Sequence, residues 1–423
     1  MDVTRRLRGV WGACAVALLA RLSAFVLLGR FAHPDVCESE IIALNLLQGK
    51  GFIYHFLGTD YRSYMEPLYP GLCAGVYAVT GHSAVALGLV QIALGTALVW
   101  LVFACARRLA SDRAAVVAAW LTALHPGLIL YTTKFHPLIL DTVCITLVVA
   151  GCLWYGERPR WRSVVRLGGL LGLCVLTRPT IVAAVPLIGW WVWRRSPPRP
   201  GLRVGEFLVI VGCAAAVVAP WVWRNYHVHH RLILTRSGTS MVFWIGNNPY
   251  RFTGSALTPE GDPVLISVAP PAVRTQLLSL DELGQQDLLL AQARQFVREH
   301  PWEFLRRWAV KWVYFWWFTP QAGLLYPPRW IRAYHAVSAP LLLLLLIGAW
   351  TLWHPQPGMW RDRQAGWLLA ALCAAIALLQ SLFYIEGRHR LAIEPLLLIF
   401  VSQGIWRVWS GQRGAASCRT GTE

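Results

Sequence analysis

The chain has 423 residues, of which 56% are apolar and only 14% are charged. Soluble globular proteins carry roughly 25% charged residues, so this composition excludes a soluble enzyme and indicates a membrane protein. The formal net charge of +18 comes almost wholly from arginine, since only Lys50, Lys134 and Lys311 are lysine. Nucleic-acid binding would need a contiguous polar basic face. Here the arginines lie between apolar runs, so we expect no nucleic-acid partner.

Ten apolar runs are long enough, or nearly so, to cross a bilayer, which takes about 20 mostly apolar residues. These runs are residues 9–32, 82–106, 114–131, 137–156, 164–177, 179–196, 204–223, 335–353, 365–384 and 390–408. The sequence therefore predicts an all-α polytopic membrane protein with about ten transmembrane helices. Surface helices are expected in the first outside loop, together with a small extracytoplasmic segment.

The predicted spans divide the chain into three parts. Residues 1–223 form an N-terminal membrane module with an outside loop over 33–81, residues 224–334 form the extracytoplasmic segment, and residues 335–423 hold the last membrane helices and a short tail. Cytoplasmic loops carry an excess of basic residues. Under the ten-span count all large arginine clusters fall inside, with both termini, provided that the stretch 67–80 does not cross the bilayer.

The first outside loop carries carboxylates in HPDVCESEIIALNLLQGKGF. Its apolar residues between Ile41 and Leu47 predict a short helix that lies on the membrane and is closed by Gly49 and Gly51. On this helix Glu38 and Ile42 share a face, whereas Glu40 points elsewhere. Acidic residues at a helix N-terminus can simply be stabilised by the macrodipole. The spacing leaves open whether Asp35, Glu38 and Glu40 have this role or take part in chemistry.

Four arginines are predicted at membrane depth on the outer side. They are Arg178 in LTRPTI, Arg224 in PWVWRNY, and Arg388 and Arg390 in RHRLAIEP. Arginine next to hydrocarbon is costly unless it is paired or solvated, so a set of them on one side favours bidentate capture of a phosphate. For each one alone, snorkelling or pairing with a nearby glutamate remains the alternative.

The stretch YTTKFHPLILDTV places Lys134, His136 and Asp141 at the outer end of a predicted span. An unpaired carboxylate would be expensive there, so Asp141 either helps to bind a sugar or forms a salt bridge. No CxxC or HExxH motif offers a metal site. We expect no cofactor; a divalent metal is possible but not indicated.

The extracytoplasmic segment contains three recognisable stretches. FWIGNNP, residues 243–249, predicts a strand-like run followed by a turn, and the amides of Asn247 and Asn248 suit that turn but can also bind sugar hydroxyls. Residues 281–300 have the pattern of a helix. Residues 308–318 carry several tryptophans and predict an interfacial helix.

Six of these stretches occur together in the order typical of one superfamily: IALNLLQGKGF after an acidic residue, EPLYPGLCAGVYAVTG, LTRPT, PWVWRNY, SGTSMVFWIGNNP and RHRLAIEP. From about residue 9 to residue 408 the chain resembles the GT-C polytopic glycosyltransferases. Within them it is most similar to the bacterial protein mannosyltransferase and aminoarabinose transferase group, which is glycosyltransferase family 39-like.

The resemblance implies transfer of a sugar from a polyprenyl-phosphate donor to an acceptor hydroxyl, with inversion, at the outer face of a bacterial inner membrane. By position in the motif it implies Glu38 as the base, with Asp35 as the runner-up, and it places Glu40 where relatives carry a tyrosine. The leaving phosphate is expected to bind the outside cations, because donors stabilise developing charge most where water is excluded. These cations are Arg178, Arg224, Arg388, Arg390 and Lys134.

Two other functions remain as alternatives. A lipid-linked sugar flippase or transporter would be expected to show internal repeats with interrupted helices, and we find none in the sequence. A lipid-linked oligosaccharide ligase or polymerase would use arginines for a diphosphate and would not need Glu38. The expected partners are the lipid-linked donor, membrane lipids and a lipid, glycan or protein acceptor.

Overall fold

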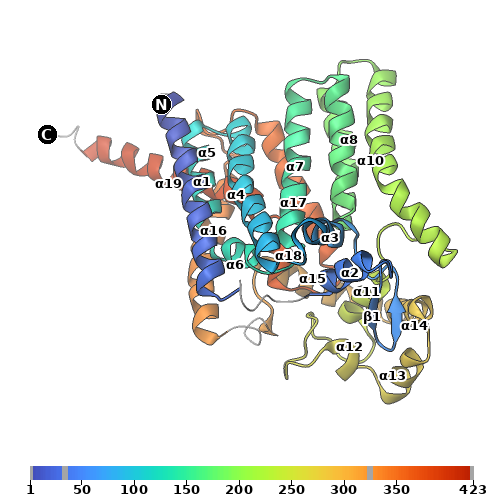
Figure 1. Ribbon diagram of the computed structural model, residues 1–423. Coiled ribbons are helices and arrows are strands. Elements are labelled where there is room, and N and C mark those ends of the chain that lie inside the picture. Colours follow the sequence, from blue (N-terminus) through green and yellow to red (C-terminus); the bar gives the residue numbers. More distant parts are fainter. Residues whose placement is uncertain (1–2, 31–36, 322–326, 420–423) are drawn as a thin grey trace.

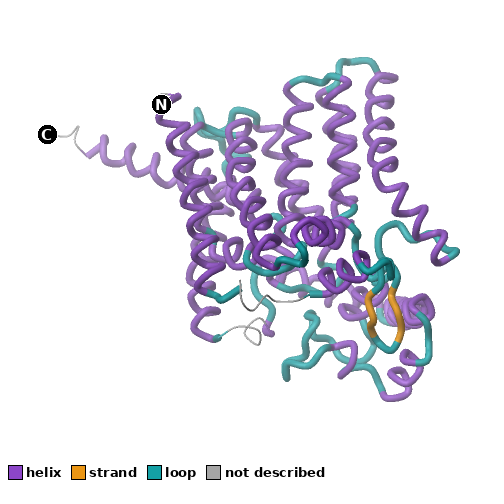
Figure 2. The backbone as a smooth tube through the Cα atoms, in the orientation of Figure 1, coloured by secondary structure: helices purple, strands orange, loops and turns teal. Residues whose placement is uncertain are grey.

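The computed structural model describes residues 3–30, 37–321 and 327–419 and is almost entirely helical (Figures 1 and 2). Every predicted apolar run forms helix, so the predicted all-α class is confirmed. In the N-terminal module the helices of these runs are α1 (Val3–Leu27), α4 (Ala84–Leu109), α5 (Asp112–Leu124), α6 (Pro126–Thr132), α7 (Leu138–Glu157), α8 (Trp161–Val175), the 3-10 helix η1 (Pro179–Ala184), α9 (Val185–Arg195) and α10 (Pro200–His229). The C-terminal ones are α16 (Pro328–Trp350), α17 (Arg363–Gln380) and α19 (Glu394–Arg419).

Six of these helices, α1, α4, α7, α10, α16 and α17, are long and apolar enough to cross a membrane within the described residues. The pair α5 and α6, which meets at an angle of 52°, raises the number to seven if it forms one broken span. The other predicted runs are helical but shorter or interrupted: α8 has 15 residues, and the run 179–196 is split between η1 and α9. The chain is thus a multi-pass membrane protein.

The first outside loop contains α2 (Glu38–Leu47), the strands β1 (Tyr54–Phe56) and β2 (Thr59–Tyr61), and α3 (Leu68–Thr80). The two strands pair antiparallel, with Tyr54 opposite Tyr61. Figures 1 and 2 show α3 almost end-on beside upright helices, an orientation that fits the predicted surface helix. The buried Glu40 carboxylate accepts hydrogen bonds from Tyr77 Oη at 2.8 Å and His82 Nε2 at 3.1 Å, and so joins α2 to α3.

The extracytoplasmic segment lies below the upright helices in Figure 1. It contains α11 (Thr239–Asn247), α12 (Val264–Ser267), α13 (Pro271–Leu278), α14 (Glu282–Glu299) and α15 (Pro301–Trp316), and the short α18 (Gly387–Leu391) comes later in the chain. The predicted helix over 281–300 is confirmed as α14, whose first turn is capped by Asp281 Oδ1 at 2.8 Å from the Gly284 nitrogen. The tryptophan-rich stretch is also helical, as α15.

The prediction of a strand-like run in FWIGNNP is wrong, because residues 243–247 belong to helix α11. Met241, Trp244 and Ile245 are buried at helical spacing against α12 and α14. A short apolar run does not by itself distinguish a strand from a buried helix. The packing of the segment therefore decided this element.

The break between α5 and α6 depends on one buried cation. Pro126 has no N–H, so it cannot donate to the Thr122 carbonyl one turn earlier. Arg21 of α1 fills this gap: its guanidinium donates to the carbonyls of Ala123 at 3.2 Å and Thr122 at 3.5 Å, and it is fully buried. Arg21 thus satisfies backbone groups that the bend would otherwise leave unpaired at membrane depth.

We predict that Arg21→Met lowers the free energy of unfolding by about 2 kcal/mol or more, because two buried carbonyls lose a charged donor. Thermal unfolding of the purified protein in detergent measures this effect. Arg8→Met, which changes an exposed arginine on the same helix, is the control and should leave the melting temperature nearly unchanged. Equal melting temperatures for both variants would show that Arg21 does not stabilise the break.

Candidate functional site

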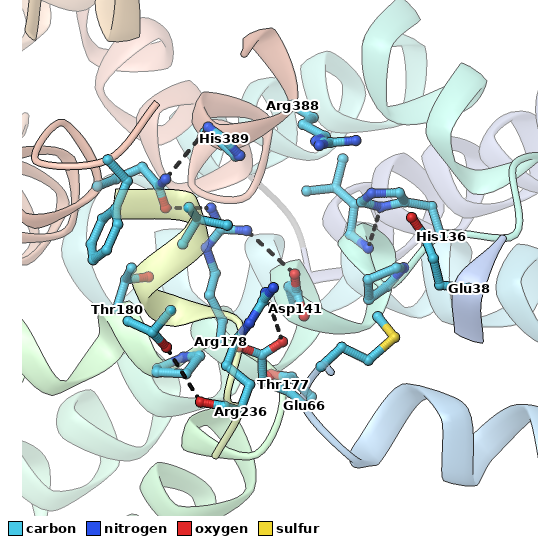
Figure 3. Close-up of a pocket in the computed structure, with 18 of the residues that line it drawn as sticks. Glu38, Glu66, His136, Asp141, Thr177, Arg178, Thr180, Arg236, Arg388 and His389 are labelled. Carbon is cyan, nitrogen blue, oxygen red and sulfur yellow. Dashed lines mark hydrogen bonds and ion pairs between the residues drawn. The ribbon is translucent and has the colours of Figure 1, made fainter. Parts of the chain in front are cut away.

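A pocket of about 280 Å³ lies where the first outside loop meets the adjacent ends of several membrane helices (Figure 3). Its walls come from α2, the segment after β2, the turn before α7, the turn between α8 and η1, α11, and the region between α17 and α18. Its charged and histidine residues are Glu38, Glu66, His136, Asp141, Arg178, Arg236, Arg388 and His389. Folding therefore gathers at one place residues that lie up to 351 positions apart, from 38 to 389.

The three arginines of the pocket each have an acidic neighbour. Arg178 Nη1 lies 3.3 Å from Asp141 Oδ2, and Arg236 Nη1 lies 3.6 Å from Glu66 Oε2. Arg388 Nη2 lies 2.9 Å from Glu386 Oε2. Within the described part of the chain, no basic side chain forms an ion pair with Glu38. Glu38 thus lines the pocket without a salt bridge, although its charge acts on Arg236.

Several buried polar atoms around the pocket have no hydrogen-bond partner among the described residues. They are the Nε atoms of Arg178 and Arg236, Oδ1 of Asp141 and Oγ1 of Thr180. Buried polar groups in folded proteins are nearly always satisfied by protein or water. These atoms therefore mark positions where a polar ligand or ordered water can bind.

The surroundings of two pocket arginines favour their charged form. Burial would lower the pKa of Arg236, but Glu66 together with the smaller contributions of Tyr64, Tyr384 and Glu38 outweighs burial, and the pKa is raised. Burial also opposes the charge of Arg388, but Glu386 together with Tyr384 and Tyr131 outweighs it, and the pKa is raised. A cationic wall is therefore present at any physiological pH, and it can stabilise an anion.

Of the residues predicted from the sequence, the structure brings four to this pocket: Glu38, Asp141, Arg178 and Arg388. Asp35 lies outside the described residues. The salt bridge foreseen as an alternative for Asp141 is present, with Arg178, yet both residues still line the pocket. The structure does not bring the other predicted residues to its walls.

Arg390 is held by the fold. Its side chain is buried, with Nε donating to Glu394 Oε2 at 2.8 Å and Nη1 donating to the Trp316 carbonyl at 2.6 Å. This pairing with Glu394 is the alternative that the sequence left open. The ammonium group of Lys134 lies 5.4 Å from the centre of the Tyr131 ring. Neither cation is among the pocket-lining residues.

The two asparagines of FWIGNNP have structural partners. Asn247 donates to the carbonyls of Phe243 and Leu382, and its Oδ1 accepts from Lys311 Nζ at 2.8 Å. Asn248 Oδ1 accepts from the backbone nitrogens of Tyr250 at 3.0 Å and Arg251 at 2.9 Å. These bonds form the predicted turn. These amides therefore stabilise the chain around the end of α11.

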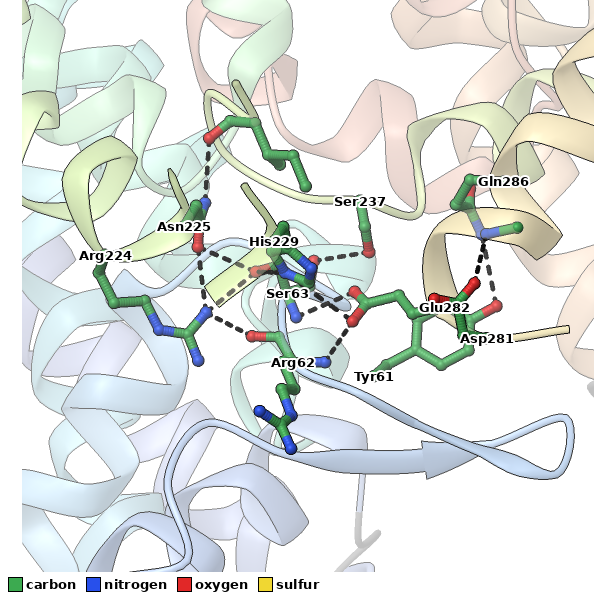
Figure 4. A network of polar contacts seen from close by, with 12 residues as sticks. Tyr61, Arg62, Ser63, Arg224, Asn225, His229, Ser237, Asp281, Glu282 and Gln286 are labelled. Carbon is green, nitrogen blue, oxygen red and sulfur yellow. Dashed lines mark hydrogen bonds and ion pairs between the residues drawn. The ribbon is translucent and has the colours of Figure 1, made fainter. Parts of the chain in front are cut away.

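Arg224 lies in a second polar cluster (Figure 4). Its Nη1 donates to the Arg62 carbonyl, to Ser63 Oγ at 3.0 Å and to Asn225 Oδ1 at 3.0 Å. Glu282 of α14 accepts from the backbone nitrogens of Arg62 at 2.6 Å and Ser63 at 3.1 Å. This cluster joins the first outside loop to the end of α10 and to α14.

The cluster also fixes two walls of the pocket. The Ser63 carbonyl accepts from the backbone nitrogen of Ser237 at 2.8 Å. Ser63 directly precedes the pocket residues Tyr64, Met65 and Glu66, and Ser237 directly follows Arg236. The geometry therefore gives Arg224 and Glu282 a positioning role for the Glu66 and Arg236 pair.

Sequence reasoning did not single out Arg236 or His389 as site residues. Arg236 lies in a polar loop without a spacing signal, and it reaches the pocket only because Ser237 binds the first outside loop. His389 stands between two arginines in RHRLAIEP, which drew attention to its neighbours. Glu66 was visible in EPLYPG as one acidic residue among several, and only its contact with Arg236 distinguishes it.

Comparisons with known proteins agree with this architecture. Residues 66–223 match the dolichyl-phosphate-mannose-protein mannosyltransferase family. The archaeal oligosaccharyltransferase AglB from Archaeoglobus fulgidus, in complex with an inhibitory peptide and a dolichol-phosphate, has 13% sequence identity and a TM-score of 0.53 over 97% of this chain and 52% of that chain. Its apo crystal structure gives the same values. The present chain thus spans about half the length of AglB.

ArnT from Cupriavidus metallidurans, bound to undecaprenyl phosphate, has 13% identity and a TM-score of 0.45 over 95% of this chain and 78% of that chain. A comparison with curated protein sequences finds no match. The likeness to AglB shows a GT-C type membrane fold, which confirms the predicted resemblance. Within that class, the match over residues 66–223 is to the mannosyltransferase family.

We predict that Glu282→Ala loosens the segment 61–66, because the backbone nitrogens of Arg62 and Ser63 lose their carboxylate acceptor. Amide hydrogen exchange should become faster in this segment, by the equivalent of about 1–3 kcal/mol of local stability. Asp287→Ala, on the same helix but in an exposed pair with Arg231, is the control and should leave the segment unchanged. Equal exchange in the two variants would contradict the positioning role.

Proposed function

We propose that this protein is a glycosyltransferase that moves a sugar from a polyprenyl-phosphate donor to an acceptor hydroxyl. The observation that carries the proposal is the pocket itself, which is lined by Glu38 together with Arg178, Arg236 and Arg388. A carboxylate can accept a proton, and guanidinium groups bind phosphate oxygens. The GT-C type fold supports this reading.

The reaction needs a base on one side of the sugar and cations on the other. Glu38 takes the proton of the acceptor hydroxyl as its oxygen attacks the anomeric carbon. The bond between that carbon and the phosphate oxygen breaks, and the leaving phosphate gains negative charge beside Arg388 and Arg178. Attack from the face opposite the phosphate inverts the configuration at the anomeric carbon. No step of this scheme requires a metal.

A second pocket, of about 610 Å³, supports the lipid character of the donor. It is bordered by α6, α16 and α18, and its lining is mainly apolar, with the aromatic residues Tyr131, Phe318 and Trp330. Arg388 lines both pockets. We place the lipid tail of the donor in this second pocket and its phosphate at Arg388, at the entrance to the first.

The proposed setting is a bacterial inner membrane, with the pocket on the outer side and both termini in the cytoplasm. The arginine-rich connections between α7 and α8 and between α9 and α10 lie on the side of the molecule opposite the extracytoplasmic segment (Figure 1). This arrangement follows the excess of basic residues expected in cytoplasmic loops. The acceptor is a lipid, a glycan or a protein.

We predict that Glu38→Gln reduces sugar transfer by at least about a hundredfold, because the amide cannot take the acceptor proton. Donor binding should persist, since no ion pair joins Glu38 to the arginines among the described residues. Transfer and donor affinity are measured on the purified variant in detergent. Full transfer activity would exclude Glu38 as the base, and Asp35→Asn is then the decisive variant.

We predict that Arg388→Ala weakens binding of undecaprenyl phosphate by about tenfold or more, because a charge-assisted contact to the phosphate is lost. The control is Arg251→Ala, which removes an exposed arginine paired with Glu260 outside the pocket. Titration of each variant with the lipid, followed by protein fluorescence, gives the dissociation constants. Unchanged affinity in Arg388→Ala would remove the phosphate from this position.

A further inference from the structure

Two histidines of the first pocket have no role in the scheme above. His136 comes from the turn before α7, and His389 comes from α18, so they reach the pocket from different parts of the chain (Figure 3). Both lie near Arg388 and Arg178, whose charges act on both rings. The question is which ring nitrogen of each histidine carries a proton.

Hydrogen bonds determine the ring nitrogen that accepts. His136 Nδ1 lies 3.1 Å from the backbone nitrogen of Leu138, and His389 Nδ1 lies 3.2 Å from that of Glu386. A backbone N–H can only donate, so each Nδ1 is the acceptor. In a neutral imidazole the proton then resides on Nε2.

A second contact supports this tautomer for His389. Arg178 Nη2 donates to Oε1 of Gln380 at 3.1 Å, which orients the amide so that its nitrogen points the other way. That nitrogen lies 3.4 Å from His389 Nδ1. Nδ1 of His389 therefore faces two donors and cannot carry a proton itself.

Both rings are neutral at physiological pH. Burial lowers the pKa of His136 well below its usual value, and the charges of Arg388, Arg178 and Lys134 add to this effect. Burial likewise lowers the pKa of His389, with further contributions from Arg388 and Arg178. A neutral ring whose Nδ1 accepts is left with one free group, the Nε2–H donor.

We propose that His136 and His389 bind the donor phosphate as neutral hydrogen-bond donors, each through Nε2–H, beside Arg388. The proposal rests on the proposed function and names further ligands of its phosphate. Neutral donors add hydrogen bonds to an anion without the mutual repulsion that further cations would bring beside two arginines. This protonation state also excludes His136 and His389 as the base of the reaction. A base needs a free ring nitrogen that can accept a proton, whereas here Nδ1 already accepts a hydrogen bond and Nε2 is protonated.

The alternative is that both histidines only stabilise the backbone at Nδ1. Asparagine and glutamine separate the two roles, because the asparagine amide reaches about as far as Nδ1 and the glutamine amide about as far as Nε2. Asparagine at 136 or 389 can still accept from the backbone nitrogen, as in an Asx turn, but has no distal donor. Glutamine supplies the distal donor, and at 389 it also suits the third position of a capping box.

The experiment measures the affinity of the full-length protein in detergent micelles for undecaprenyl phosphate and for its uncharged alcohol, undecaprenol. We expect His136→Asn and His389→Asn each to weaken undecaprenyl phosphate binding by about tenfold and to leave undecaprenol binding unchanged. His136→Gln and His389→Gln should recover most of the lost affinity. Melting temperatures of the asparagine variants should stay near that of the wild type.

Three results would overturn the proposal in distinguishable ways. If the asparagine variants bind both lipids like the wild type, the histidines are not phosphate ligands, although the proposed function stands. If they lose both lipids equally, or melt at a clearly lower temperature, their role is structural. If the wild-type protein does not prefer the phosphate over the alcohol, the proposed donor is itself wrong, and the histidine ligands with it.

Discussion

Charge at the edge of hydrocarbon is the constraint on which this structure depends. A guanidinium or carboxylate taken out of water needs a partner, and the chain places many such groups near the ends of its membrane helices. Arg21 donates hydrogen bonds to backbone carbonyls at the break between α5 and α6. Arg390 donates hydrogen bonds to the Glu394 carboxylate and the Trp316 carbonyl. The contacts of Arg21 with Ala123 and of Arg390 with Trp316 join segments that are distant in sequence.

The same constraint creates the pocket. Arg178, Arg236 and Arg388 each have an acidic neighbour, yet atoms of the first two, together with Asp141 Oδ1, remain without partners in the described structure. The acidic neighbours hold these arginines in place, and the open positions leave room for a ligand. A site for an anion is thus assembled from ion pairs that are incompletely satisfied.

The wall of the pocket depends in turn on contacts outside it. The bond between Ser63 and Ser237 joins the first outside loop to the loop after α10. Glu282 joins the first outside loop to α14. Arg224 belongs to this cluster and is not among the residues that line the pocket. Its partners are the Arg62 carbonyl, Ser63 Oγ and Asn225 Oδ1, which join the first outside loop to the end of α10.

The amino-acid sequence was sufficient to predict the membrane class, the helical nature of each apolar run, the helices α2 and α14, and the superfamily resemblance. These follow from local composition, periodicity and motif order, which one stretch of chain carries alone. It also identified Glu38, Asp141, Arg178 and Arg388, because charged residues are conspicuous in apolar surroundings.

Which cations face the pocket, and which are held elsewhere, depends on the folded arrangement and could not be predicted from the sequence. Arg388 and Arg390 are two residues apart and look alike in sequence, but one lines the pocket and the other pairs with Glu394. For the same reason Arg236 and His389 line the pocket, and residues 243–247 of FWIGNNP form a helix. The partner of a buried polar group, and the packing of a short apolar run, depend on residues hundreds of positions away, and folding alone brings them together.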